Sequence, residues 1–339
     1  MKKTTLKEIA KTLNISISTV SKALKDYPDV SKNTKQRVIE LAEAVNYSPN
    51  AFAQSLRSKE SKTIGVIIPS MVHYYFSSVI TAILKEAEER GYMVIIMQSN
   101  EDVALEIKQV DLLINKGVDG ILISLSNNTN NFTHLQKIIN YDVPLVLFDK
   151  ITKLINCSKV IINDKKASYD AVSYLIEKGY KRIAYFRGDL NPQNSIDRFL
   201  GYKKALEDHN IIFDSSIVYT CSNADFEEGY LNAEKLITEH GQTIDAICTM
   251  TDLTAIGVIN YLNEKQIKIP EDIAVLGFSN WFMSTVITPT LSSVEQNAQK
   301  TGEKSIEVLF QEIECKQKDL PITHQTIIID TELIVRNST

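Results

Sequence analysis

The first fifty residues carry apolar side chains at the spacing of short helices. The first apolar face repeats at i, i+3, i+4 and i+7 and consists of Leu6, Ile9, Ala10 and Leu13. Thr5 and Glu8 stand at its start, a hydroxyl followed three residues later by a carboxylate, which is the capping-box pattern. This pattern predicts a helix that begins after Thr5 and ends before a break at residues 14–16.

A second short helix is expected after that break, with Ser16 or a neighbour as its cap. Its inner side consists of Val20, Ala23 and Leu24. Its outer side is polar and basic and carries Ser18, Thr19, Ser21 and Lys22. A third helix begins at Ser31 and directs inward Val38, Leu41, Ala42 and Val45. Two short helices on a tight turn, the second one polar outward, predict a helix-turn-helix whose second helix can enter a DNA major groove.

From Thr63 onward, apolar runs of strand length alternate with segments of helical spacing. The runs that predict strands are 64–68, 92–97, 120–124, 144–148, 160–163, 182–186, 217–220, 246–249, 273–278 and 326–335. The segments that predict helices are 74–90, 101–116, 131–141, 165–178, 197–209, 226–240, 252–264 and 295–313. This α/β alternation predicts doubly wound parallel sheets, and it runs twice along the chain. We therefore expect two half-sized subdomains with a ligand cleft between them, at the carboxyl ends of their strands.

Charge is divided unevenly between the two regions. The chain has 339 residues and a formal net charge of −5. Residues 1–62 contain 12 Lys or Arg and 6 Asp or Glu, a net charge of +6, so the rest of the chain carries −11. A basic head on an acidic body fits a polyanionic partner for the head alone. The alternative is a basic face that contacts only solvent.

Cysteine usage and hydropathy indicate a cytoplasmic protein. The four cysteines are far apart and form no C-x-x-C pair: Cys157, Cys221, Cys248 and Cys315. We therefore expect reduced, structural thiols. The N-terminal residues lack the apolar core of a secretion signal, and no apolar run approaches the length of a membrane span. These features predict a soluble intracellular protein with no membrane partner.

Residues 47–62 narrow the helix-turn-helix prediction to one class of protein. Tyr47-Ser48-Pro49-Asn50 is followed by the short apolar segment 51–56 and then by a charged linker. With these residues the chain resembles the LacI family of bacterial transcription repressors. The resemblance is carried, without a gap, by the stretch LKEIAKTLNISISTVSKALKDYPDVSKNTKQRVIELAEAVNYSPNAFAQSLRS.

The resemblance continues through the α/β region, in segments that include KGVDGILIS, EKGYKRIAYFRGD, TMTDLTAIGVINYL and IPEDIAVLGFSN. It implies two subdomains of the periplasmic-binding-protein type I fold, joined by three chain crossings. The implied division is a DNA-binding domain at 1–57 with a hinge helix at about 50–57, a linker at 58–62, and an effector-binding and dimerisation domain at 63–339. Within this last domain, one subdomain is expected at about 63–161 and 292–324 and the other at about 162–291 and 325–339.

For DNA binding, the family places base-reading side chains at the positions of Ile17, Ser18 and Lys22. Lys22 can donate to guanine O6 and N7, and Ile17 can contact a thymine methyl group. The alternative for Ile17 is packing into the core of the head, because residues 17, 20 and 24 share a helical spacing. Lys22 stands where most family members carry arginine, which leaves its base preference open. Phosphate contacts are implied, beside ordinary capping and solvation, for Thr5, Ser16, Thr19, Ser21, Asn33 and Thr34.

The implied hinge helix adds Asn50, Ala53 and Leu56 to the DNA-binding set. In the family this helix lies in the minor groove beside that of its dimer mate, and paired leucines wedge open a central base step. Leu56 is the matching residue, and the alternative is a core leucine. A charged linker follows Leu56 within one residue, so little core is left for it to join.

For the effector, the resemblance implies a set of eight cleft residues: Tyr75, Phe76, Asp149, Arg198, Phe226, Asp252, Asn280 and Trp281. Their chemistry suits a sugar, because aromatic rings cover apolar ring faces while carboxylates and a guanidinium bind hydroxyls. The alternative for Phe76 and Phe226 is core packing. Asp252 could be only a helix cap, since a carboxylate is favoured at a helix start. Thr251 replaces a common Asn and Ser279 a common Asp, so the identity of the ligand stays open.

The sequence therefore predicts a dimeric repressor that binds an inverted-repeat operator in double-stranded DNA and responds to a small-molecule effector, most simply a carbohydrate. We expect no catalytic residues, no metal and no cofactor, because the chain contains no G-x-G-x-x-G, P-loop, G-x-S-x-G or H-E-x-x-H motif. The alternatives are a freestanding sugar-binding or transport protein and a sugar-acting enzyme. The binding or transport protein would fit the body but not the head and would need a secretion signal, and the enzyme lacks a catalytic motif. The chain shows no heptad tail, which favours a dimer.

Overall fold

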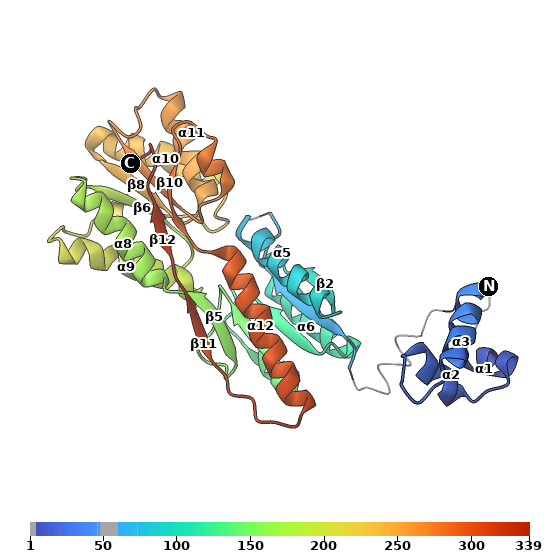
Figure 1. The fold of residues 1–339 in the computed structure, drawn as a ribbon. Helices are drawn as coiled ribbons and strands as arrows, with labels where there is room; N and C mark the ends of the chain where they lie inside the picture. Colours follow the sequence, from blue (N-terminus) through green and yellow to red (C-terminus); the bar gives the residue numbers. More distant parts are fainter. Residues whose placement is uncertain (1–4, 46, 48–59, 73) are drawn as a thin grey trace. The chain divides into compact units, whose positions relative to one another are not determined.

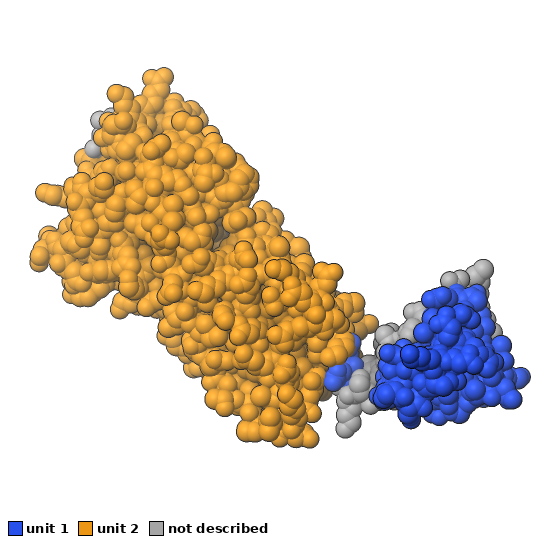
Figure 2. Space-filling model, viewed as in Figure 1, with its two compact units in different colours: residues 1–61 blue, residues 62–339 orange. Residues whose placement is uncertain are grey.

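The computed structural model describes residues 5–45, 47, 60–72 and 74–339. Two compact units divide the chain, Met1–Ser61 and Lys62–Thr339 (Figure 2). The expected division into a small helical head and a long α/β region corresponds to these units, with the change at residue 62.

The first unit contains the helices α1 (Leu6–Leu13), α2 (Ile17–Leu24) and α3 (Lys32–Ala44). The capping box of α1 is confirmed, because the Thr5 hydroxyl accepts from the backbone N–H of Glu8 while the Glu8 carboxylate accepts from the N–H of Thr5 at 2.7 Å. Ser16 caps α2 and Ser31 caps α3 in the same way. These caps matter because helices of eight residues are marginal alone.

Among the described residues of this unit, seven buried side chains form the core: Ile9, Ala10, Val20, Ala23, Val30, Val38 and Ala42. The helical spacings in the sequence predicted most of them. Val45 was expected to point inward and does not, since its side chain is 36% exposed. The reason is that α3 ends at Ala44 and Val45 is its C-cap, so the apolar face stops one turn earlier than the periodicity suggested.

The second unit contains two six-stranded sheets (Figure 1). The first has the order β11-β5-β4-β3-β1-β2, with bounds Thr326–Ile329, Ser158–Ile162, Leu145–Phe148, Gly120–Ile123, Thr63–Ile68 and Met93–Gln98. The second has the order β12-β10-β9-β8-β6-β7, with bounds Glu332–Ile334, Ser292–Glu295, Ala274–Phe278, Ala246–Thr249, Ile183–Arg187 and Val218–Thr220. The strand pairs are parallel except β10 with β12. The predicted doubly wound α/β class is confirmed.

Helices cover these sheets. They are α5 (Tyr74–Glu89), α6 (Val103–Lys116), α7 (Thr133–Asn140), α8 (Asp164–Glu177), α9 (Gln193–Asp208), α10 (Phe226–His240), α11 (Asp252–Glu264) and α12 (Ala298–Gln317), with short 3-10 turns at Ser215–Ile217, Gly241–Thr243 and Phe282–Thr285. Helices α5 and α12 pack side by side (Figure 1). Gly302 permits this contact, because a Cβ there would lie 2.4 Å from the carbonyl oxygen of Val79.

The chain crosses between the two sheets after β5, after β10 and after β11. Two expected boundaries were wrong. Strand β10 pairs with β9 in the second sheet, although residues from 292 were expected in the first subdomain. Strand β11 pairs with β5 in the first sheet, although residues from 325 were expected in the second. An apolar run predicts that a strand exists, but the sheet edge that it joins depends on which partner has free backbone groups beside it.

None of the helices in the described part of the chain is long and apolar enough to cross a membrane.

Candidate functional site

The outer face of α2 presents the side chains that the sequence suggested for base reading. Ile17, Ser18 and Lys22 are exposed, and Ile17 keeps 44% of its surface accessible. The inward-packing alternative for Ile17 is therefore wrong. The cap at Ser16 turns α2 so that Val20 and Ala23 fill the core, which leaves residues 17, 18 and 22 facing outward.

Several side chains expected at phosphates also stabilise the helix starts. The Ser16 hydroxyl accepts from the N–H of Thr19 at 3.0 Å and bonds the hydroxyls of Ser18 and Thr19. The hydroxyl of Thr34 bonds that of Ser31 at 2.8 Å, and Asn33 is exposed beside them. The three contacts of the Ser16 hydroxyl use its one proton and two lone pairs, so a phosphate would have to replace one of them. The Thr34 hydroxyl bonds that of Ser31 and can also contact a phosphate. Asn50, Ala53 and Leu56, which the family resemblance assigns to DNA binding, lie outside the described residues.

In the α/β unit a cavity of about 200 Å³ opens at the carboxyl ends of strands from both sheets. Six of the eight expected effector residues line it: Tyr75, Phe76, Asp149, Arg198, Asp252 and Trp281. They come from α5, the end of β4, α9, the start of α11 and the loop after β9. The topology brings these segments together although they span two hundred residues of sequence.

Phe226 and Asn280 do not line the cavity. Phe226 stacks on Tyr230 one helical turn further along α10, with ring centroids 6.5 Å apart. Asn280 directs its side-chain amide to protein partners, because its oxygen accepts from Arg336 at 2.6 Å and its nitrogen donates to Glu295 at 2.8 Å. Phe76 combines both suggested roles, since it lines the cavity and also packs edge-on against Phe148.

The guanidinium of Arg198 is the most constrained charge in the cavity. Its Nε donates to Asp164 at 2.7 Å and its Nη1 to the carbonyl oxygen of Met250 at 3.1 Å. The guanidinium carbon lies 3.7 Å from the centre of the Phe278 ring. The side chain is 9% exposed, and the neighbouring carboxylates Asp164 and Asp149 hold the pKa of Arg198 above its usual range against the cost of burial.

Asp149 and Asp252 are buried carboxyls at the cavity wall. Burial raises the pKa of Asp149, and the charges of Lys150 and Arg198 offset part of this rise. Burial raises the pKa of Asp252 to about 6, although hydrogen bonds from the Ser293 hydroxyl and the N–H of Trp281 favour its ionised form. Asp252 is not the N-cap of α11, because Thr251 holds that position and accepts from the N–H of Thr254. Its carboxylate lies in the first turn of the helix, where the helix dipole also favours it.

A second group of lining residues was not anticipated from the sequence. Lys150 donates to Glu101 at 2.6 Å and also bonds the side-chain oxygen of Asn127. Glu101 in turn accepts from the N–H of Asn127 at 2.5 Å. These residues follow the strands β2, β3 and β4, so their place at strand ends was the signal available in the sequence.

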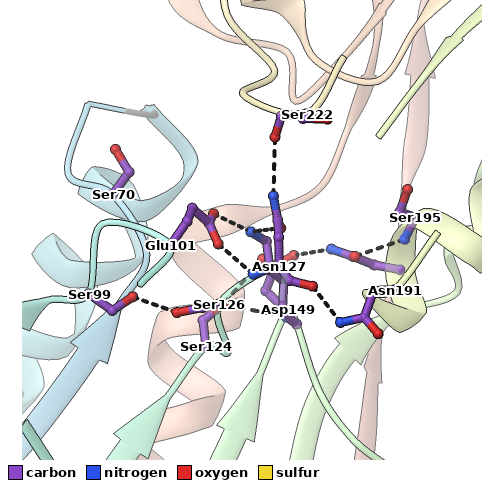
Figure 3. Close-up of polar contacts among 12 residues, drawn as sticks. Ser70, Ser99, Glu101, Ser124, Ser126, Asn127, Asp149, Asn191, Ser195 and Ser222 are labelled. Atoms are coloured by element: carbon purple, nitrogen blue, oxygen red, sulfur yellow. Dashed lines mark hydrogen bonds and ion pairs between the residues drawn. The ribbon is translucent and has the colours of Figure 1, made fainter. Parts of the chain in front are cut away.

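Polar contacts join the two subdomains across the cavity (Figure 3). Asn127 donates to the carbonyl oxygen of Ser222 at 3.2 Å, and Asn191 donates to that of Asn127 at 2.5 Å. Asn194 donates to Asp149 at 3.2 Å. The hydroxyl of Ser195 also lines the cavity, is buried, and has no hydrogen-bond partner among the described residues. The cleft is thus held by side-chain amides and retains an unsatisfied hydroxyl.

Comparison with known families agrees with this architecture. Residues 61–334 match the family described as periplasmic binding proteins and sugar binding domain of LacI family, and residues 5–50 match the bacterial regulatory proteins of the lacI family. The chain belongs to the LacI family of bacterial regulatory proteins. The resemblance seen in the sequence is therefore confirmed over almost the whole chain.

Similar proteins include the transcriptional repressor PurR of Histophilus somni, 29% identical over 334 residues, with 98% of each chain covered. Catabolite control protein A of Priestia megaterium is 32% identical over 310 residues, which cover 90% of this chain and 91% of that protein. Among solved structures, the regulator CcpA of Lactococcus lactis is 27% identical with a TM-score of 0.73, over 82% of this chain and 98% of that one. The Lac repressor dimer bound to operator shares the fold, with a TM-score of 0.87, 22% identity and 99% of each chain covered.

In this LacI-family chain, replacing Asp252 should change how stability depends on pH. Folding raises the pKa of this carboxyl from 3.8 to about 6, so its ionised form costs stability and the cost grows as pH rises through that range. In Asp252→Asn the amide cannot ionise, yet it can accept from Trp281 and donate to Ser293. Unfolding in urea at a series of pH values should show the variant gaining up to about 3 kcal/mol relative to wild type between pH 4 and 7.

Asp170→Asn on α8 is the control, because it removes an exposed carboxylate that pairs with Lys166, and the gain expected of Asp252→Asn should be absent from it. Parallel stability curves for wild type and Asp252→Asn would contradict a raised pKa at this site.

Removing a cross-cleft amide should open the cavity. Asn191→Ala deletes the bonds from Asn191 to the carbonyl oxygens of Asn127 and Thr129, and a net loss of about 1 kcal/mol would raise an open population roughly fivefold. Trp281 is the single tryptophan of the chain and lines the cavity, so its fluorescence reports on this site alone. Acrylamide should quench Trp281 more strongly in Asn191→Ala than in wild type.

The exposed Asn223 supplies the control, because Asn223→Ala changes a nearby loop of the same subdomain and should leave quenching as in wild type. Equal quenching in all three proteins would show that the Asn191 bonds do not hold the cleft closed.

Proposed function

We propose that this protein is a transcriptional repressor whose affinity for an operator in double-stranded DNA is controlled by a small molecule bound in the cleft. The observation that carries this proposal is the outward face of α2, where Ile17, Ser18 and Lys22 are exposed on a folded helix-turn-helix. A helix of this kind presents its side chains to the major groove. As a DNA-binding regulator the protein acts where the bacterial chromosome lies, in the cytoplasm.

The positive net charge of the head supports DNA as its partner. Residues 1–62 carry a net charge of +6 in a chain whose total is −5. Lysines and arginines that neutralise phosphates release counterions, and this release supplies much of the affinity for DNA. The acidic remainder of the chain would be repelled by the same phosphates, so we assign the contact to the head alone.

A carbohydrate is the effector class that the cavity chemistry favours. Both cations of the lining already have a carboxylate partner, since Lys150 pairs with Glu101 and Arg198 pairs with Asp164. Acceptors remain on Asp149, and the buried hydroxyl of Ser195 has no partner among the described residues. Aromatic rings complete the lining, with Tyr74 and Trp281 stacked 6.4 Å apart. A neutral ring with several hydroxyl groups matches these groups.

An apolar surface on the first subdomain supports assembly into a homodimer. Strand β2 is the last strand of its sheet, and Met93 on it is 61% exposed. The flanking helices add Leu84 on α5 and Leu112 on α6, each more than 40% exposed. Large apolar side chains exposed on an edge strand and on the helices beside it favour an interface there. Two recognition helices related by a two-fold axis would read an inverted repeat, with the hinge residues Asn50, Ala53 and Leu56 proposed between them.

Selection of binding sites from random DNA tests the DNA-binding part of the proposal. Wild-type protein should select an inverted repeat, because the site mirrors the symmetry of a dimer. Lys22→Ala should lose roughly 1–3 kcal/mol on the selected site and relax the preference at one base pair of each half-site. Lys11→Ala on α1 is the control and should weaken binding without changing the selected sequence. A selected direct repeat, or no selected sequence, would contradict the proposal.

A thermal-shift screen against neutral sugars, sugar phosphates and nucleobases tests the effector part. A ligand at 100 times its dissociation constant should add about 2.7 kcal/mol of stability. Asp149→Asn preserves the shape of the cavity wall but replaces an acceptor by an amide, so effector affinity should fall at least about tenfold. Asp170→Asn, on the exposed side of α8, should leave effector affinity unchanged. Stabilisation by nucleobases alone would exclude a carbohydrate, and an unaffected Asp149→Asn would exclude this residue from the site.

A further inference from the structure

The base-facing lysine of α2 is not free in the structure. Lys22 is the basic residue of α2 and lies in its last turn. Its ammonium forms a hydrogen-bonded ion pair with the carboxylate of Asp29, which belongs to the turn between α2 and α3. Both side chains remain about half exposed, at 47% and 53%. The pair therefore sits on the surface beside the groove-facing side chains, where DNA can reach it.

The second acid of the same turn has a different role. Asp26 accepts from Lys35 of α3 through both its carboxylate, at 2.6 Å, and its carbonyl oxygen, at 3.1 Å. This contact fastens the turn to α3. Backbone bonds from Asp26 to Ala23 and from Tyr27 to Lys22 close the turn after α2. These contacts stabilise the turn without Asp29. The ion pair of Asp29 with Lys22 is therefore not needed for the fold of the turn.

An acidic side chain is unfavourable beside DNA. A carboxylate repels phosphates, and one that neutralises a lysine also reduces the counterion release that drives general DNA binding. The placement of Asp29 against Lys22 therefore lowers affinity for DNA of any sequence. A residue that lowers general affinity can still increase discrimination, because specificity is a difference between two affinities.

We propose that Asp29 is a specificity-determining residue, which directs the ammonium of Lys22 and restricts the base pair that this lysine accepts. The inference rests on the proposed binding of DNA through α2. A lysine ammonium is a point charge on a flexible stem, unlike the planar fork of arginine, so its direction must be set from outside. Asp29 supplies that direction through the ion pair.

A directed ammonium matches guanine in the major groove. Guanine presents two acceptors, O6 and N7, which suit the ammonium of Lys22. A lone lysine would accept any base with an exposed acceptor and would also turn to a phosphate. The ion pair therefore converts a general cation into a reader of one base pair.

The test compares Asp29→Asn with Asp26→Asn. Both variants lose one negative charge from the same turn, but only the first releases Lys22. Both should bind random DNA more tightly and to a similar extent, because each removes one repelling charge. Only Asp29→Asn should reduce discrimination at the base pair whose preference Lys22→Ala also relaxes, by at least about fivefold. Site selection and competition titrations against random DNA at several salt concentrations measure both effects.

The double variant that combines Lys22→Ala with Asp29→Asn tests whether Asp29 changes base preference only through Lys22. In the Lys22→Ala background, Asp29→Asn should cause no further change in base preference, because Asp29 acts through Lys22. Three results would overturn the inference: an unchanged preference in Asp29→Asn, an equal relaxation in Asp26→Asn, or an additional relaxation in the double variant. Wild-type protein that selects no sequence would instead refute the proposed DNA-binding function. Lys22, Asp26 and Asp29 are all exposed, Asn has the shape of Asp, and the bond from Lys35 to the backbone carbonyl of Asp26 remains in Asp26→Asn. All variants should therefore retain wild-type helix content by circular dichroism.

Discussion

The buried guanidinium of Arg198 sets the geometry on which the cleft depends. A charge removed from water is tolerated only with a partner, and here the partner is Asp164, the first residue of α8 after the chain crosses between sheets. The same guanidinium donates to the carbonyl oxygen of Met250 after β8 and lies over the ring of Phe278 at the end of β9. One side chain therefore joins the start of a helix to the ends of two strands and presents what remains of its surface to the cavity.

Around this fixed group, the closure of the cleft rests on weaker contacts. Side-chain amides of Asn127, Asn191 and Asn194 bridge the two subdomains with one or two hydrogen bonds each. Such bonds contribute about 1 kcal/mol each, so a ligand with several hydroxyl groups could replace them without a large net cost. A rigid charged anchor beside exchangeable amide contacts suits a site whose two walls must respond to a bound molecule.

The helical head is stabilised in a different way from the cleft. Among its described residues, seven small or medium apolar side chains are fully buried, and further partly buried ones pack against them. Its helices α1 and α2 have eight residues each, and caps at Thr5 and Ser16 supply stability that such short helices lack. The outer faces of the helices carry exposed polar and charged side chains, and part of this charge is paired, as in the contact of Lys22 with Asp29.

The sequence by itself determined the helices of the head, the α/β alternation and, through family resemblance, six residues of the cavity. These depend on local spacing and on strand ends, which periodicity records. Only the tertiary structure decided that β10 and β11 join sheets other than those expected. It also decided that Asn280 hydrogen-bonds Arg336 and Glu295 and does not line the cavity, and that Asn127 and Lys150 do line it. Each of these outcomes is a pairing between residues far apart in sequence. Such pairings depend on which backbone and side-chain groups find unsatisfied partners in the folded chain, and local spacing does not encode that.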